Sequence, residues 1–156
     1  MKENVTRPNL LGALLLAAVA GVVAAADRPA VNSPAPAATA KATNEQVIAY
    51  YFHGTIRCET CLKIEKQARE TIERRFQTEI FEKRLMFKPV NYDKAENAHF
   101  LKEYKLPCPS LVVVRQKGGK DEEWKLLGET WDLIGNPFKL NEYIEREVEK
   151  ILRNAK

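Results

Sequence analysis

The chain has 156 residues, which is enough for one ordinary domain with a hydrophobic core. Its three cysteines are too few for a small domain held together by several disulfides. The formal net charge of +4 is modest, and basic and acidic residues alternate along the predicted helices without forming a basic stripe. We therefore expect no nucleic-acid binding.

The first 26 residues have the pattern of a secretory signal peptide. Lys2 and Arg7 precede an uncharged apolar run at 10–26, which ends in three alanines. This pattern predicts cleavage after Ala26, and the alternative is an uncleaved N-terminal membrane anchor. In both cases we expect the rest of the chain to be exported, to the periplasm or another extracytoplasmic space, where disulfides form and persist.

Residues 27–43 are rich in Pro, Ala, Ser and Thr and have almost no bulky apolar side chains, which predicts a linker. The folded domain is therefore expected at 44–156, with the element order β-α-β-α-β-β-α. The predicted elements are a strand at 46–52, a helix at 58–82, a strand at 85–91, a short helix at 94–104, a strand at 110–114, a strand at 123–128 after a turn, and a helix that begins after Asn136.

Two predicted strands, at 46–52 and 110–114, are continuous apolar runs, which are typical of strands covered on both faces. Pro89 cannot donate a hydrogen bond to a neighbouring strand, so the strand at 85–91 belongs at a sheet edge. Numbered along the chain, the strands are then expected in the order 2-1-3-4. Two right-handed crossovers would make the first three strands parallel, and a hairpin would add an antiparallel strand. The predicted fold class is α/β, a four-stranded mixed sheet with helices on both faces.

Apolar stripes indicate the buried faces of the two long helices. In the first helix the stripe is Leu62, Ala68, Ile72 and Phe76. Asn136 can cap the last helix, and Pro137 can occupy its first turn. The stripe of that helix is Leu140, Ile144, Val148 and Ile151, and its charged run, which includes Glu147, is predicted to be solvated.

Cys58 and Cys61 are the candidate catalytic residues. Cys58 follows a central strand at the start of a helix, and chemistry in open α/β sheets lies beyond the carboxyl ends of the strands. The free N–H groups of the helix start and the charge of Arg57 would stabilise a thiolate at Cys58. Cys61, one turn further along and less exposed, is placed to attack a mixed disulfide formed at Cys58. In an exported chain this spacing predicts a redox pair.

A structural disulfide or part of a metal site are the alternatives for the same cysteines. A tetrahedral zinc site would need a fourth ligand besides Cys108. Cys108 is either a small buried residue or, if it faces Cys58, the third sulfur of a site for a soft ion such as Cu(I). His53 is either a base for Cys61 or a turn histidine without such a role, and His99 is expected at the surface.

The stretches YYFHGTIRCETC and LPCPSLVVV, with the hairpin and helix that follow, resemble the thioredoxin-like superfamily without the first strand and helix of thioredoxin. The longer stretch YYFHGTIRCETCLKIE is most similar to small exported thioredoxin-like proteins labelled nitrophenyl-compound nitroreductase subunits. The resemblance implies a cis bond between Cys108 and Pro109 that faces the C-x-x-C turn. It also implies that Pro109 and the backbone before it bind a partner's extended chain.

The chain departs from thioredoxin at three places. Arg57 replaces the tryptophan before the first cysteine, and Glu59 and Thr60 replace the Gly-Pro pair between the cysteines. Phe52 stands where thioredoxin buries an aspartate that assists proton transfer. The direction of electron flow is therefore left open by the sequence.

These patterns together predict an exported thiol–disulfide oxidoreductase, an enzyme that uses Cys58 and Cys61, with Arg57, Cys108 and Pro109 in support. Its expected partners are cysteine-containing exported proteins and a membrane or exported electron donor or acceptor. We expect a monomer with no cofactor and no metal. The alternatives are a thiolate protein that binds metal or arsenite through the three cysteines, and an accessory subunit of a nitroreductase system.

Overall fold

The computed structural model describes residues 44–155, and the predicted signal peptide at 1–26 and linker at 27–43 lie outside them. Along this part of the chain no helix is both long enough and apolar enough to cross a membrane. The elements are β1 (Glu45–His53), α1 (Glu59–Arg75), α2 (Gln77–Phe81), β2 (Leu85–Asn91), the 3-10 helix η1 (Ala95–Asn97), α3 (His99–Glu103), β3 (Ser110–Lys117), β4 (Lys120–Leu126), α4 (Thr130–Leu133) and α5 (Pro137–Asn154).

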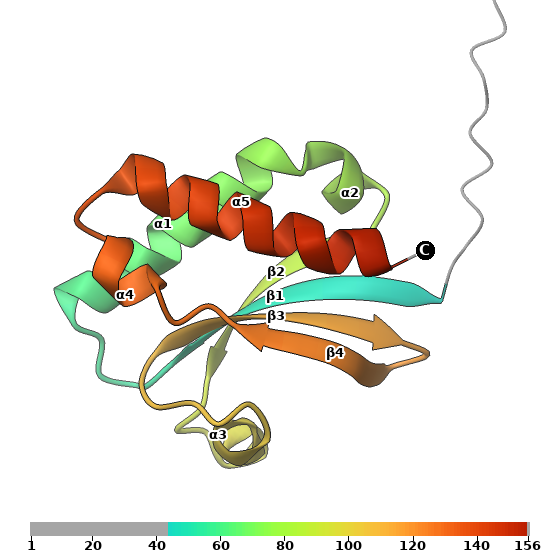
Figure 1. Ribbon diagram of the computed structural model, residues 1–156. Coiled ribbons are helices and arrows are strands. Elements are labelled where there is room, and N and C mark those ends of the chain that lie inside the picture. The colour runs from blue at the N-terminus through green and yellow to red at the C-terminus, as the bar shows by residue number, and fades with distance from the viewer. Residues whose placement is uncertain (1–43, 156) are drawn as a thin grey trace, which may run out of the picture. The chain divides into compact units, whose positions relative to one another are not determined.

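The four strands form one mixed sheet in the order β2-β1-β3-β4, which confirms the predicted order. Figure 1 shows α1 and α5 over one face of the sheet and α3 on the other. The α/β fold class with helices on both faces is therefore confirmed. Pro89 lies in the edge strand β2, where its missing N–H costs no ladder hydrogen bond.

The direction of β3 differs from the prediction. β1 and β2 are parallel, but β3 runs antiparallel to β1, with Ser110 opposite Phe52. For β3 to be parallel, the chain after β2 would have to return along the length of the strands to the end of the sheet where β1 begins. Such crossover connections usually contain a long helix. The connection after β2 contains only η1 and α3, which have three and five residues. It stays at the carboxyl end of β1, so β3 must run back along β1.

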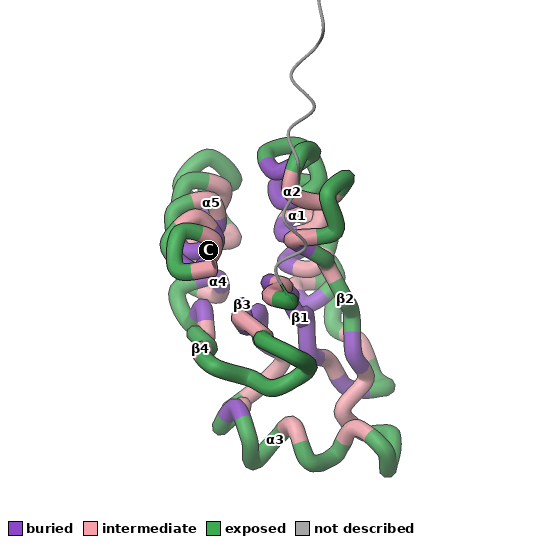
Figure 2. The backbone as a smooth tube through the Cα atoms, turned by 90° about the vertical axis from the view of Figure 1, so that its right-hand side faces the viewer, coloured by how far each residue is buried: buried purple, intermediate pink, exposed green. Residues whose placement is uncertain are grey.

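Alternate residues of β1 enter two apolar clusters, one on each face of the sheet. Val47, Ala49 and Tyr51 pack beneath α1 and α5, and Ile48, Tyr50 and Phe52 pack toward α3. All six are buried, which explains why the run shows no polar alternation. Figure 2 shows buried positions in β1 and on the sides of α1 and α5 that face inward.

The hairpin between β3 and β4 is tighter than predicted. Its turn consists of Gly118 and Gly119, with φ values of 59° and 78°. Two successive residues with positive φ are the mark of a type I′ turn, whose twist matches that of the strands. β4 therefore begins at Lys120, before the predicted strand at 123–128.

The long helices follow most of their predicted patterns. Asn136 caps α5 by accepting a hydrogen bond from the Lys139 N–H at 3.2 Å, and Pro137 begins the helix. The apolar stripe of α5 is buried as predicted. In α1 the prediction for Leu62 is wrong, since Leu62 is half exposed and Cys61 and Ile64 are buried instead. The helical region is also broken at Phe76 into α1 and α2.

Candidate functional site

Cys58 and Cys61 form a disulfide at the start of α1, with their Cα atoms 5.1 Å apart. Cys58 is the N-cap residue of the helix and is exposed, whereas Cys61 is only 5% exposed. The Cys61 N–H donates to the Cys58 sulfur at 3.1 Å. The sulfur at the helix start can therefore be reached from solvent and is held by a backbone donor, and the second sulfur is covered.

The loop before Cys58 is held by the end of β2. The Thr55 N–H donates to the Asp93 carboxylate at 2.7 Å, and the Asn91 amide donates to the Thr55 hydroxyl at 3.0 Å. A Cβ at Gly54 would lie 3.2 Å from the Asp93 Oδ2 atom, so this close approach favours glycine. The position of Cys58 thus depends on a strand that is distant in the sequence.

Tyr51, in β1, forms a hydrogen bond with the first turn of α1 from the sheet face that this helix covers. Its buried hydroxyl donates to the Cys61 carbonyl at 2.7 Å. Burial raises the pKa of Tyr51 well above its usual range, so the phenol remains a neutral donor. The sequence analysis did not find this contact, because an apolar run does not show which side chain faces the cysteines.

Arg57 does not lie free beside the Cys58 sulfur. Its guanidinium forms an ion pair with Glu65, which also pairs with Arg69 at 3.2 Å. The same guanidinium lies 5.8 Å from the centre of the Tyr51 ring. Burial alone would raise the pKa of Glu65, but the two arginines hold it below its usual value. The charge of Arg57 is thus largely balanced by a carboxylate that the sequence analysis did not single out.

The predicted cis bond before Pro109 is wrong, because no cis peptide bond occurs among residues 44–155. A trans X–Pro bond is favoured intrinsically by about 0.5–1 kcal/mol, and only the family resemblance suggested otherwise. Two backbone carbonyl groups of this segment already accept hydrogen bonds from side chains of the same domain. The Cys108 carbonyl accepts from the Ser110 hydroxyl at 2.7 Å, and the Pro109 carbonyl accepts from the Trp131 indole at 2.8 Å. The predicted docking role of this segment loses its main support.

Cys108 is a free, half-buried cysteine. It precedes Pro109, and β3 begins one residue later at Ser110, which lies opposite Phe52 of β1. Within 44–155, no three Cys, His, Asp or Glu side chains are arranged to hold a metal ion. Cys58 and Cys61 are joined in a disulfide here, and the soft-metal site considered from the sequence stays a prediction.

The two histidines differ in their surroundings. His53 lies at the end of β1, with its Nδ1 atom 2.9 Å from the Gly54 carbonyl and its ring stacked beside Tyr51. Its role as a base for Cys61 stays a prediction. His99 is exposed, as expected. Phe52, which stands where thioredoxin buries an aspartate, is buried in the apolar cluster on the α3 face.

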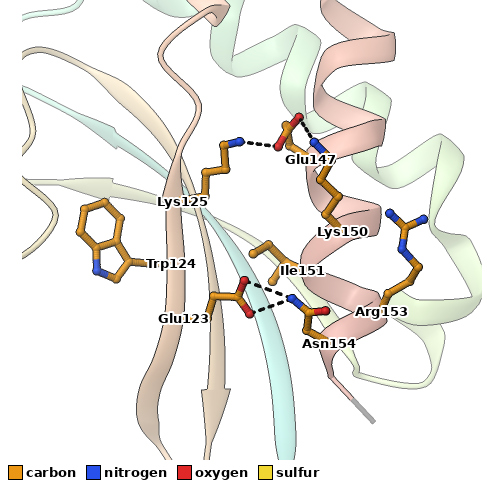
Figure 3. A pocket seen from close by; sticks show the side chains of 8 residues that line it. All are labelled: Glu123, Trp124, Lys125, Glu147, Lys150, Ile151, Arg153 and Asn154. Carbon is orange, nitrogen blue, oxygen red and sulfur yellow. Dashed lines mark hydrogen bonds and ion pairs between the residues drawn. The ribbon is translucent and has the colours of Figure 1, made fainter.

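A surface pocket of about 450 Å³ lies between β4 and α5, away from any cysteine (Figure 3). Its lining residues are Glu123, Trp124, Lys125, Glu147, Lys150, Ile151, Arg153 and Asn154. Figure 3 shows Glu147 between Lys125 and Lys150, and Glu123 paired with Asn154. Most of the charged groups in the pocket form ion pairs with one another, which indicates that they hold β4 and α5 together. The prediction that Glu147 is solvated is wrong, because it is 2% exposed.

The strand order, the parallel β1–β2 pair, the antiparallel hairpin and the C-x-x-C disulfide at the start of α1 define a thioredoxin-like fold with a disulfide site. No family model and no curated protein matches the chain.

Two solved structures show a low similarity to the chain. One, described as the structure of a malarial protein, has a TM-score of 0.34 and 16% identity over 51% of this chain and 79% of that one. The other, a thioredoxin from Thermus thermophilus in solution, has a TM-score of 0.31 and 17% identity over 58% of this chain and 72% of that one. Neither similarity bears on the activity.

Proposed function

We propose that the protein is a thiol–disulfide oxidoreductase in which Cys58 attacks and Cys61 resolves. The observation that carries this proposal is the disulfide at the start of α1, with an exposed Cys58 and a buried Cys61. An attacking sulfur must be reached by a partner, and a resolving sulfur must not react with solvent species first. The two positions match these two requirements.

In the reducing direction, the Cys58 thiolate attacks one sulfur of a partner disulfide. A bond forms between the two proteins, and the other partner sulfur leaves as a thiolate and takes up a proton. Cys61, after losing its proton, attacks the Cys58 sulfur and displaces the second partner sulfur. Two electrons have then passed to the partner, and the Cys58–Cys61 disulfide is restored. The same steps in reverse oxidise a dithiol, and no cofactor takes part.

The surface around Cys58 suits a polypeptide partner. Ile56, two residues before Cys58, is 94% exposed, and Leu62 is 50% exposed in the first turn of α1. Apolar side chains beside a reactive sulfur can contact the chain that carries the partner disulfide. We propose that cysteine-containing exported proteins bind here and that a membrane or exported partner supplies or removes the electrons. The accessory role in nitroreduction stays a prediction from the sequence resemblance.

The roles of the two cysteines are tested by trapping. Cys61→Ser should accumulate mixed disulfides with exported proteins, because Cys58 can attack but nothing resolves the bond. Cys58→Ser should trap none, and Cys108→Val should retain most disulfide reductase activity toward insulin. Non-reducing electrophoresis and mass spectrometry of the alkylated proteins give the result. Trapping by Cys58→Ser alone would reverse the two roles, and a dominant Cys58–Cys108 disulfide would contradict the mechanism.

A further inference from the structure

Ion pairs connect Arg57, the residue before Cys58, to Glu65 and Glu65 to Arg69. The Arg57 guanidinium and the Glu65 carboxylate form a direct ion pair, and their side chains are only 21% and 16% exposed. Glu65 also accepts from Arg69 at 3.2 Å, and Arg69 is itself 3.9 Å from Glu73. Partly buried charges are screened less by water and salt than exposed ones.

This ion pair contacts the groups that hold both cysteines. Arg57 is bonded directly to Cys58 in the chain, and its guanidinium lies over the ring of Tyr51. Tyr51 in turn donates to the Cys61 carbonyl. By contrast, Glu59 is also beside Cys58, but its side chain is 81% exposed and pairs with Lys63 in solvent. The Arg57–Glu65 pair is thus connected to Cys58 through the chain and to Cys61 through Tyr51, and water screens it less than the exposed Glu59–Lys63 pair.

We propose that the Arg57–Glu65 ion pair sets the reduction potential of the Cys58–Cys61 disulfide, with Arg57 favouring the reduced form and Glu65 opposing it. The proposal deepens the proposed function and rests on it. A positive charge stabilises the Cys58 thiolate, which exists only after reduction, and so raises the potential. Glu65 balances that charge and so lowers the potential. Glu65 is therefore a positioning residue that acts through Arg57.

The equilibrium with glutathione measures this effect. Two glutathione molecules reduce the protein disulfide, so that one glutathione disulfide forms and the protein gains two electrons. Cys61 takes up a proton, and Cys58 takes one up only when it is not a thiolate. Reduced and oxidised protein are separated after alkylation with a maleimide reagent of high mass. A second readout is the rate at which iodoacetamide alkylates Cys58 at pH 6, which follows the thiolate fraction.

The two partners of the ion pair should have opposite effects. Arg57→Gln should lower the equilibrium constant for reduction by about three- to tenfold and slow the alkylation. Glu65→Gln should raise that constant by a similar factor and speed the alkylation, because two arginines are then left without their carboxylate. A tenfold change corresponds to about 30 mV. Arg57→Lys keeps the charge and should remain within about threefold of the wild type.

A matched ion pair at the other end of α1 provides the control. Arg75 pairs with Glu149 at 2.6 Å, with both side chains about half to one third exposed. Arg75→Gln and Glu149→Gln should leave the equilibrium constant and the alkylation rate unchanged. Urea unfolding of all variants shows how much each substitution destabilises the domain. If the substitutions acted only by disturbing the structure, Arg57→Gln and Glu65→Gln would shift the reduction potential in the same direction.

Changes of the same sign in Arg57→Gln and Glu65→Gln, or no change in either, would overturn the proposal. Neither readout needs a protein partner. If Cys61→Ser traps no partner while the two variants still shift in opposite directions, the proposed function fails and the electrostatic effect stands. If trapping succeeds but the potentials do not move, only this inference fails.

Discussion

The carboxylate of Glu147 links α5 to β4 through an ion pair with Lys125. It lies 2.7 Å from the Lys125 ammonium and 2.9 Å from the Lys150 ammonium (Figure 3). It also lies 3.0 Å from the Arg146 guanidinium. Burial by itself would raise the pKa of Glu147, but the three cations lower it to about 2. A buried carboxylate with three partners is costly to remove, because the cations lose their common partner.

We predict that Glu147→Gln lowers the free energy of unfolding at pH 7 by about 2 kcal/mol. This value allows for the solvent around the three cations, which are about half exposed and therefore bind the carboxylate less strongly than buried ones would. The folded pKa lies below the ordinary value of 4.5, so this stabilisation is present above pH 4.5 and is lost as the pH falls toward 2. Urea unfolding at pH 7, 4 and 2.5 measures it. Glu142→Gln, at an exposed position of the same helix, should have little effect at any pH. An equal loss for Glu147→Gln at pH 7 and pH 2.5 would contradict the prediction.

At the scale of single elements, the hairpin and α1 show how local geometry prepares the site. The type I′ turn fixes the register of the pairs next to it, from Lys117 and Lys120 to Gln116 and Asp121, and the register shifts by one residue at Arg115. β3 begins at Ser110, directly after Cys108 and Pro109, so the hairpin also holds the segment that lies near Tyr51. Cys58 is the N-cap of α1, a position where Ser, Thr, Asp or Asn is usual, so its sulfur accepts the capping hydrogen bond.

The hairpin turn gives a prediction with a matched pair of substitutions. Gly118 has a φ of 59°, a region that asparagine tolerates and β-branched residues avoid. Gly118→Asn should leave the stability within about 0.5 kcal/mol of the wild type, whereas Gly118→Val should cost about 1–2 kcal/mol. A Cβ at this position meets only the Asn44 side chain, at 3.7 Å, which is an ordinary contact. The difference between the two variants therefore reports the backbone conformation and not steric crowding. Chemical denaturation gives both values, and equal stability of the two variants would argue against the turn type.

At the scale of the whole molecule, the domain is built around two central strands that are buried on both faces. Among residues 44–155, the buried members of the apolar clusters on the two sides of the sheet extend from Val47 to Ile151. The Cys58–Cys61 disulfide lies at the edge of this core and joins residues only three apart in the sequence. Such a short loop contributes little to stability through chain entropy, at most about 2 kcal/mol. The core therefore supports the site, and the disulfide is free to open and close.

We predict that a chain limited to 44–156 folds as a cooperative unit and keeps its thiol chemistry. Its melting temperature should lie within about 3 °C of the full-length protein, because every residue of the two clusters is retained. Circular dichroism on heating measures the melting temperature, and reduction of insulin by dithiothreitol in the presence of each protein measures the exchange. A fall of many degrees in the shortened chain would show that residues 1–43 stabilise the domain.

The sequence by itself determined the features that depend on neighbouring residues. The apolar runs predicted both central strands, Pro89 predicted the edge strand, and Asn136 with Pro137 predicted the start of α5. The spacing of Cys58 and Cys61 predicted that the two cysteines can pair, since residues three apart at the start of a helix lie side by side, and the structure joins them in a disulfide. Each of these signals is contained within a few residues of the chain.

The tertiary structure alone decided the features that depend on distant partners. It set the antiparallel direction of β3, because the short connection after β2 stays at one end of the sheet. It retained the trans bond before Pro109 and brought the Tyr51 hydroxyl to the Cys61 carbonyl. It also paired Arg57 with Glu65 and buried Glu147 among three cations. The physical reason is that an apolar or charged pattern shows which side chains can be buried or paired, whereas packing between elements selects the partner that each one meets.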